Sequence, residues 1–234
     1  MRHNAYMLQF VKLAWHFTMK SLKPPVKSPR SLTAPRSSRA SAPTFGQIRI
    51  IGGLWRGRKF QFPATNNLRP TPDRVREMLF NWLQNQLHDT RCLDLFCGSG
   101  ALGLEALSRG AAHCTFVDSE IAAITAISQH LHTLQCTQAT LIHAALPQGF
   151  TQIIPAYDVV FIDPPYADEI LDHCLQALMT PQLLNNTAWV YIECSSTRAM
   201  PTLPHGFSLH RHKTTGQVQS VLLRWQADIQ QPST

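Results

Sequence analysis

The spacing of hydrophobic positions changes along the chain, and each change predicts a different element. In residues 48–63, short apolar runs surround three glycines, which predicts one or two β-hairpins. In the next segment, "LRPTPDRVREMLFNWLQNQL", apolar side chains recur at helical spacing and predict an amphipathic helix over residues 72–87. Thr71 is expected to be the N-cap of this helix, with Pro72 in its first turn.

From residue 91 onward, short apolar runs alternate with helical patterns. Strands are predicted at 91–97, 113–118, 139–144, 157–163, 188–194, 207–213 and 217–225. Helices are predicted after the glycine turn at 98–103, over 119–134 and over 168–179. Such alternation is typical of a parallel sheet with helices on both faces, and the last two strands are close enough to form an antiparallel hairpin. The expected fold class is α/β, with a mostly parallel seven-stranded sheet that ends in an antiparallel hairpin.

Composition fits one domain of moderate size with an appendage. Of the 234 residues, 44% are apolar, which is enough for a full core. No run reaches the roughly 18 apolar residues that would predict a membrane span, so a cytoplasmic protein is expected. The six cysteines form no CxxC pair and are predicted to be small buried hydrophobic residues in a reduced compartment. The 11 histidines show no HxxxH or HExxH spacing, so no metal is predicted.

The net charge of +7 is unevenly distributed. Residues 1–47 contain eight Lys and Arg and no acid, which leaves 13 basic and 14 acidic residues in the rest. Residues 20–46 are rich in Pro, Ser and basic residues and have too few large apolar groups to offset their conformational entropy, so they are predicted to be disordered. The chain therefore divides into an extension (1–46), an N-terminal hairpin and helix (47–90) and a core (91–228).

A glycine-rich turn follows the first strand of the core. "DLFCGSGALG" places Gly98, Gly100 and Gly103 between a strand and a helix, where glycine lets the backbone turn tightly and approach a ligand. Asp118 comes 20 residues after Gly98, at the end of the next strand. That spacing suits a carboxylate that accepts both hydroxyls of an adenosine ribose.

Two classes of cofactor fit this turn. A dinucleotide would place its pyrophosphate at the helix N-terminus, whereas S-adenosylmethionine (SAM) would place its amino-acid end along the turn. Asp94 favours SAM, because an anion there is badly placed beside a pyrophosphate but well placed near a methionine ammonium. A turn without any ligand is the remaining alternative. The residues expected to contact the cofactor are Asp94, Phe96, Gly98, Ser99, Gly100, Asp118 and Ser119.

The fourth core strand, in "YDVVFIDPPY", ends in an unusual tetrapeptide. In a doubly wound sheet its carboxyl end faces the same crevice as the glycine turn. The prolines restrict the backbone, so the carbonyl of Pro164 points in one direction. Asp163 and that carbonyl can accept both protons of an amino group, while Tyr166 offers a flat face for stacking. The predicted catalytic residues are Asp163, Pro164, Pro165 and Tyr166, and a plain strand-ending turn is the alternative.

This arrangement suits the exocyclic amino group of a nucleobase. Holding both N–H bonds aims the nitrogen lone pair at a methyl group, and such positioning can supply several kcal/mol of the barrier. A base inside a duplex cannot enter the pocket, so it must be unpaired or flipped.

Several motifs carry a family resemblance. "DLFCGSGALGLEALSRGA" with "FIDPPY" resembles class I SAM-dependent amino-methyltransferases that carry the [DNS]PP[YFW] motif. "RIIGGLWRGRKF", "LRPTPDRVREMLFNWL" and the terminal "GQV" narrow the resemblance to the RsmD family, bacterial 16S ribosomal RNA guanine-N2 methyltransferases, over roughly residues 47–226. The resemblance implies a Rossmann-like class I fold, SAM as donor, and a guanine of small-subunit 16S rRNA as acceptor. A monomer is expected.

One departure from the family pattern concerns the adenine site. Related enzymes often offer a polar or acidic side chain to the adenine amino group after the third core strand. This chain has Ala144 and Ala145 there, so no adenine-binding side chain is assigned and adenine is expected to be bound by backbone.

Basic residues concentrate before the core. Residues 49–76 contain seven Lys and Arg against Asp73 alone, with Trp55, Phe60 and Phe62 interleaved, which suits an RNA backbone and predicts that region 47–90 faces RNA. A solvated basic surface is the alternative, and Arg74 or Arg76 could instead pair with an acid. The residues expected to contact RNA are Arg49, Arg56, Arg58, Lys59, Arg69, Thr71 and Arg74.

Other interpretations stay open. The extension could be an RNA-attracting arm, an over-extended start with Met19 as the initiator, or an organelle transit peptide. The same type of tetrapeptide motif occurs in DNA adenine-N6 and cytosine-N4 methyltransferases, although no DNA-target domain is evident. A nonenzymatic RNA-binding ribosome-assembly protein is a third function, which the two alanines support and the intact DPPY opposes. An NAD-dependent oxidoreductase is the fourth and least favoured function, because the sequence shows no set of Lys, Tyr or His residues for hydride transfer.

Overall fold

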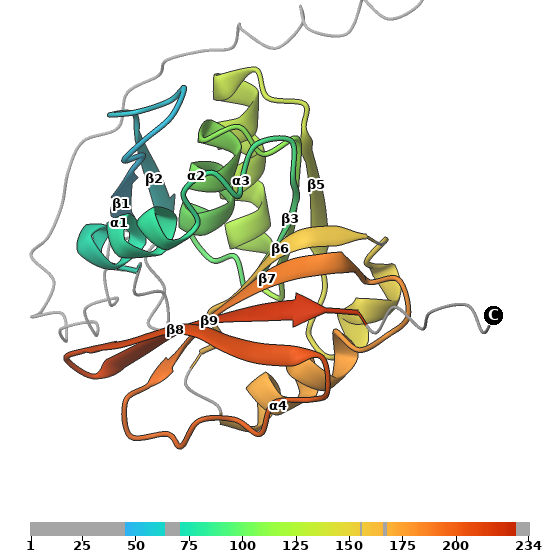
Figure 1. The fold of residues 1–234 in the computed structure, drawn as a ribbon. Coiled ribbons are helices and arrows are strands. Elements are labelled where there is room, and N and C mark those ends of the chain that lie inside the picture. The colour runs from blue at the N-terminus through green and yellow to red at the C-terminus, as the bar shows by residue number, and fades with distance from the viewer. Residues whose placement is uncertain (1–44, 64–70, 155, 166–167, 228–234) are drawn as a thin grey trace, which may run out of the picture. The chain divides into compact units, whose positions relative to one another are not determined.

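A seven-stranded sheet forms the centre of the protein (Figure 1). The computed structural model describes residues 45–63, 71–154, 156–165 and 168–227, all within one compact unit, Ala42–Thr234. The predicted extension therefore lies outside the described residues, except for its last two positions. Within the described part, no helix is long and apolar enough to cross a membrane.

The sheet confirms the predicted α/β class. Its strand order is β5-β4-β3-β6-β7-β9-β8, with β9 antiparallel to β7 and β8 and all other pairs parallel. The strands are β3 (Arg91–Leu95), β4 (His113–Asp118), β5 (Ala139–His143), β6 (Tyr157–Ile162), β7 (Leu184–Ser195), β8 (Phe207–Thr215) and β9 (Val218–Gln226). The chain winds one way from β3 to β5 and then returns to β6, so the order reverses between β3 and β6. Ligands bind at such a switch point.

Helices cover both faces of the sheet. The helices α1 (Asp73–Trp82), α2 (Ala101–Ser108) and α3 (Ile121–Leu134) lie on one face, and α4 (Asp168–Ala177) lies on the other (Figure 1). A short 3-10 helix, η1 (Gln148–Gln152), follows β5. Alternate residues of a strand enter opposite cores: Phe161 packs with α1, α2 and α3, whereas Val160 and Ile162 pack with α4. Both faces are buried, which is why these strands are almost uniformly apolar.

The predicted helix over 72–87 differs from the structure at both ends. It ends at Trp82, and i→i+3 turns with Asn85 in the left-handed region follow, although Leu83 and Leu87 remain buried. The prediction that Thr71 is the N-cap is wrong, because Pro72 occupies that position without a side-chain cap bond. The Thr71 hydroxyl instead donates to a carboxylate 92 residues away, as described below.

A single two-stranded hairpin precedes α1. Its strands, β1 (Phe45–Arg49) and β2 (Lys59–Pro63), pair antiparallel, and their buried side chains share one hydrophobic core with α1, α2 and α3. Phe60 and Phe62 are part of this core and are buried. These two aromatic residues of the basic region therefore pack in the core and are not exposed to RNA.

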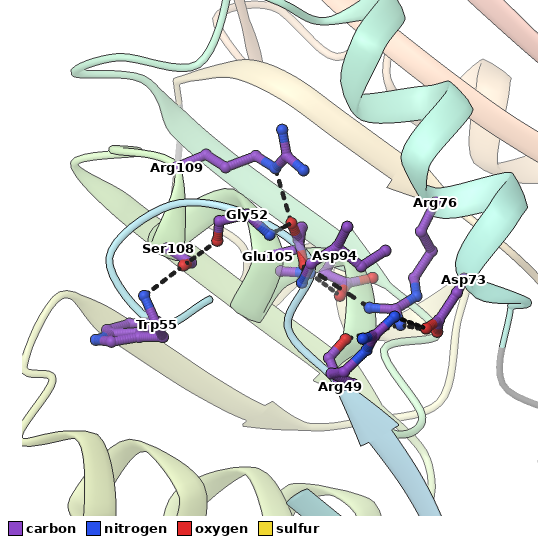
Figure 2. A network of polar contacts seen from close by, with 11 residues as sticks. Arg49, Gly52, Trp55, Asp73, Arg76, Asp94, Glu105, Ser108 and Arg109 are labelled. Carbon is purple, nitrogen blue, oxygen red and sulfur yellow. Dashed lines mark hydrogen bonds and ion pairs between the residues drawn. The ribbon is translucent and has the colours of Figure 1, made fainter. Parts of the chain in front are cut away.

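The hairpin loop is bound to α2 through the buried carboxylate of Glu105 (Figure 2). The backbone N–H groups of Ile51 and Gly52 each donate to it at 2.7 Å. Arg109 Nε donates to the same carboxylate at 2.8 Å, and Arg76 lies 3.8 Å from it. Two backbone donors and two guanidinium groups thus offset the cost of burying this charge.

Ser108, one turn later on α2, continues this attachment (Figure 2). Its hydroxyl donates to the Gly52 carbonyl at 2.6 Å and accepts from the Trp55 N–H at 2.9 Å. Gly53 has φ +74°, and a Cβ there would lie 1.8 Å from the Ser108 carbonyl oxygen. The loop can approach α2 this closely only because that residue is glycine.

We expect Glu105→Ala to lower the free energy of unfolding by about 3 kcal/mol or more, because two backbone donors and Arg109 lose their acceptor and buried Arg76 loses a nearby counter-charge. Urea unfolding followed by circular dichroism measures this. Glu77→Ala, which removes an exposed carboxylate from α1, is the matched control and should change stability little. An equal, small loss in both variants would contradict the role given to Glu105.

Candidate active site

The parallel pairing of β3 with β6 brings two predicted motifs to one edge of the sheet. Leu95 pairs with Ile162, so the residues that follow each strand emerge side by side. The glycine turn over 96–100 follows β3, and Asp163 to Pro165 follow β6. The predicted shared edge for these two motifs is confirmed, whereas Tyr166 lies outside the described residues.

The glycine turn has an unusual backbone. Phe96, Gly98 and Gly100 have φ values of +62°, +49° and +75°. A non-glycine residue in the left-handed region is uncommon and is often found at functional sites. A Cβ on Gly100 would lie 2.9 Å from the Ile127 side chain of α3, so glycine lets the turn pack against that helix. Ser99 is buried within the turn.

Asp118 holds this turn from the end of β4. Its Oδ2 accepts from the Gly98 N–H at 2.7 Å, and its Oδ1 accepts from the Glu120 N–H at 2.9 Å. Each oxygen keeps a second lone pair, so the carboxylate can also accept from a ribose diol. The neighbouring Ser119 is exposed. The contact of Asp118 and Ser119 with a cofactor stays a prediction.

Asp94 lies beneath the turn and is 2% exposed. Its Oδ2 accepts from the Gly103 N–H in the first turn of α2, at 2.9 Å. A Cβ on Gly103 would lie 2.3 Å from the Phe116 ring, so the third glycine of the motif permits close packing of helix on sheet. Burial, with a smaller contribution from the charges of Asp163 and Asp118, raises the pKa of Asp94 to about 8, and the Gly103 hydrogen bond opposes that shift. A bound cation would favour its ionised form, and contact with a methionine ammonium stays a prediction.

Asp163 is partly buried at the end of β6, and Thr71 donates a hydrogen bond to its Oδ2 at 3.2 Å. Burial raises the pKa of Asp163 to about 6, and the Thr71 hydrogen bond opposes that shift. Thr71, expected to contact RNA, is thus 8% exposed and lies beside the predicted catalytic carboxylate. Pro164 is partly exposed and Pro165 is exposed.

Sequence reasoning missed Glu193 on β7, which is 5% exposed and carries a carboxyl close to Asp163. Burial, followed by the charge of Asp163, raises the pKa of Glu193 to about 8. The signal in the sequence was a lone acid in the apolar strand "AWVYIEC". An acid at such a position needs a partner or a proton.

These carboxyl groups suit a cationic ligand. Asp118 and Asp163 lie near enough to Asp94 for their charges to raise its pKa. A sulfonium with a nearby ammonium fits such an edge, whereas a pyrophosphate would be repelled from it. The glycine turn and its acidic surroundings therefore fit SAM and disfavour a dinucleotide.

Comparison with known proteins decides the family. A family model described as "Conserved hypothetical protein 95" matches residues 48–224. The chain is 44% identical over 173 residues to "Ribosomal RNA small subunit methyltransferase D" of Escherichia coli K12, covering 74% of this chain and 87% of the relative. The chain belongs to the RsmD family.

Other relatives agree with that assignment. An RsmD protein of Haemophilus influenzae is 41% identical, with 74% of this chain and 91% of the relative covered. A solved structure described as "Putative methyltransferase yhhF from Escherichia coli" superposes with a TM-score of 0.72 at 42% identity, covering 78% of this chain and all of that one. The RsmD fold is that of class I SAM-dependent methyltransferases, and SAM is the cofactor of this enzyme class.

The adenine end of the site is apolar. The Ala144 N–H donates to the Asp118 carbonyl at 2.9 Å, and the Ala145 carbonyl accepts from the Gly149 N–H at 2.8 Å. Neither alanine supplies a polar side chain, so binding of adenine by backbone alone stays a prediction for this RsmD protein.

The structure divides the predicted RNA-contacting residues. Arg56 and Arg58 are exposed on the hairpin loop, Lys59 is exposed at the start of β2, and Arg74 is exposed on α1. Arg49 is half-exposed and pairs with Asp73 at 3.1 Å. Arg69 lies outside the described residues.

One of the seven basic residues in 49–76 is buried. Arg76 is 1% exposed, donates to Asp73 at 2.6 Å and to the Arg49 carbonyl at 2.9 Å, and therefore stabilises the fold. Pairing with an acid, which the sequence had left open for this residue, is what the structure shows.

A second basic surface was missed in the sequence. Residues 194–227 contain no Asp or Glu, and Arg211 and Lys213 are exposed on β8, the outermost strand. Val218 of β9 pairs with Ser195 at the carboxyl end of β7, so the β8–β9 turn lies at the same edge as Asp163. The sequence signal for this surface was the run of residues without Asp or Glu. Its place beside the site follows only from the strand register.

We expect Asp118→Ala to raise the dissociation constant for SAM at least tenfold, because the turn loses its anchor and the ribose loses a charged acceptor. Isothermal titration calorimetry measures it. Glu77→Ala removes the same charge far from the turn and is the control. An unchanged affinity in Asp118→Ala would remove this residue from the cofactor site.

Proposed function

We propose that the protein transfers a methyl group from SAM to the exocyclic N2 of a guanine in 16S rRNA of the small ribosomal subunit. The observation that carries the proposal is the shared edge at which the glycine turn and Asp163-Pro164 meet. In this proposal, that edge holds the acceptor for the amino group beside the site for the methyl donor. The relatives named as small-subunit rRNA methyltransferases support RNA as the substrate.

Asp163 and Pro164 would hold the amino group of the base. The carboxylate and the Pro164 carbonyl each accept one N–H, which fixes the nitrogen and turns its lone pair toward the donor. SAM supplies a methyl group on a positively charged sulfur, which leaves with the electron pair of the broken C–S bond. The extra proton on the methylated nitrogen then passes to Asp163 or to water. Because burial raises the pKa of Asp163, this carboxylate is a better proton acceptor than an ordinary aspartate.

The base must reach this edge unpaired, and stacking on Tyr166 remains part of the proposal. The exposed residues Arg56, Arg58 and Lys59 would bind rRNA phosphates on the hairpin side of the site, and β8 would bind them on the other. We further propose that the protein acts as a monomer in the cytoplasm, and that region 47–90 faces the RNA.

The decisive experiment incubates the protein with labelled SAM and small subunits from a strain that lacks the modification, and then maps the labelled nucleotide. We expect label on the N2 of one guanine. Free 16S rRNA and duplex DNA serve as competing substrates, and label on DNA adenine or cytosine would overturn the proposal in favour of a DNA methyltransferase.

Asp163→Ala tests the proposed mechanism in the same assay. We expect transfer to fall by about a thousandfold or more, because the amino group loses a charged acceptor and its orientation. SAM affinity should stay within about threefold of wild type, since no cofactor contact is assigned to Asp163. Full turnover by this variant would remove Asp163 from the mechanism.

Replacing Arg56, Arg58 and Lys59 together with Gln tests the RNA surface. If each contacts a phosphate, the slope of log K against log salt should become shallower by about two. Filter binding of 16S rRNA at several salt concentrations measures this slope. Arg224→Gln, at the opposite edge of the sheet, is the control. Identical slopes for the triple variant and wild type would contradict the role of the loop.

A further inference from the structure

The carboxyl group of Asp163, in the proposed site, has a second carboxyl group next to it on the neighbouring strand. Ile162 of β6 pairs with Ile192 of β7 in a parallel register, so the next residues, Asp163 and Glu193, lie opposite each other. Two residues earlier on each strand, Phe161 and Tyr191 face the core that contains α1. Side chains two positions apart on a strand lie on the same face. The two side chains therefore point to the same face.

A chain of hydroxyl groups joins the two carboxyls to the core. The Thr71 hydroxyl donates to Asp163 at 3.2 Å, and the same hydroxyl is near enough to Glu193 to lower the pKa of that carboxyl. On the far side, the Tyr191 hydroxyl donates to Glu193 Oε1 at 2.8 Å and lies 3.1 Å from the Ser220 hydroxyl. These groups from β6, β7, β9 and the segment before α1 are the polar neighbours of Glu193 that the described residues provide.

Two adjacent buried carboxylates repel, so one of them keeps a proton. Glu193 is the more buried of the two and, unlike Asp163, lies away from the open edge. Burial and the charge of Asp163 raise the pKa of Glu193 to about 8, whereas the pKa of Asp163 is raised to about 6. At neutral pH the proton therefore belongs to Glu193, and Asp163 is ionised.

We propose that Glu193 is a positioning residue: its protonated carboxyl donates to Thr71, whose hydroxyl donates to Asp163 and aims that carboxylate at the substrate amino group. Tyr191 donates to Oε1, so in this proposal Oε2 carries the proton that Glu193 donates to Thr71. The proposal rests on the proposed function in one respect, namely that Asp163 accepts an amine. Glu193 itself touches neither substrate nor donor.

Ionisation of Glu193 would reverse this arrangement. The Thr71 hydroxyl would then donate to Glu193, and Asp163 would lose its hydrogen bond and face a second negative charge. Activity should therefore be low below about pH 6, where Asp163 is protonated, and should fall again above about pH 8, where Glu193 loses its proton.

The test compares pH profiles of kcat/KM for wild type, Glu193→Gln and Glu193→Ala. A neutral amide can donate to Thr71 and accept from Tyr191, so Gln should recover at least tenfold over Ala at neutral pH and abolish the decline at high pH. The low-pH decline, which belongs to Asp163, should stay. A Glu193→Gln profile that superimposes on wild type would overturn the proposal.

The link through Thr71 is tested with an isosteric pair. Thr71→Val keeps the shape but removes the hydroxyl and should lower kcat at least tenfold, with SAM affinity unchanged, whereas Thr71→Ser should restore most of the rate. Equal activity of the Val and Ser variants would break the proposed chain. Urea unfolding of each variant confirms that the fold is kept.

A readout without substrate separates this proposal from the proposed function. Infrared difference spectra between pH 7 and pH 9 should show protonated carboxyl bands from Asp94 and Glu193, and the Glu193 band should disappear in Glu193→Gln while the Asp94 band stays. If the Glu193 band is present but no RNA is methylated, the proposed function fails, whereas the protonation of Glu193 is supported. If the RNA is methylated but the band is absent, the positioning role fails alone.

Discussion

The parallel pairing of β3 with β6 is the constraint on which the site depends. It reverses the strand order at that point and places the ends of two segments, separated by more than 60 residues, at neighbouring positions. The glycine turn and the Asp-Pro-Pro motif each have limited chemical meaning alone. Side by side, they form the edge at which the proposed site lies. The largely apolar strands that form this pairing are buried on both faces, so core packing holds their ends in place.

Buried carboxyl groups serve different purposes within this fold. Glu105 is surrounded by two backbone N–H groups and two arginines, and it attaches the hairpin loop to α2 (Figure 2). Asp94 supports the first turn of the same helix through Gly103. Glu193 has hydroxyl partners and a neighbouring carboxyl instead of a cation. Burial and the neighbouring Asp163 charge, without a cation to offset them, explain why the pKa of Glu193 is raised.

The attachment of the hairpin to α2 also connects the basic loop with the cofactor turn. Helix α2 begins directly after Gly100, and one to two turns later it carries Glu105 and Ser108, which hold the loop. The exposed Arg56 and Arg58 therefore have a fixed position relative to the glycine turn. An RNA held by this loop would meet the donor site at a defined distance, which suits an enzyme that must select one base among many.

Period and motif determined much of this protein directly from the sequence. Short apolar runs that alternate with helical patterns predicted the seven strands. The glycines, Asp118 and the DPPY tetrapeptide predicted which strand ends form the site. These signals are local in the chain. Tertiary structure decided what depends on distant partners. Thr71 has the local pattern of an N-cap but bonds to Asp163, Arg76 belongs to a basic run but is buried, and Glu193 becomes significant only beside Asp163. A side chain's burial and the charge of its neighbours come from strand register and packing, and no local stretch of sequence contains that information.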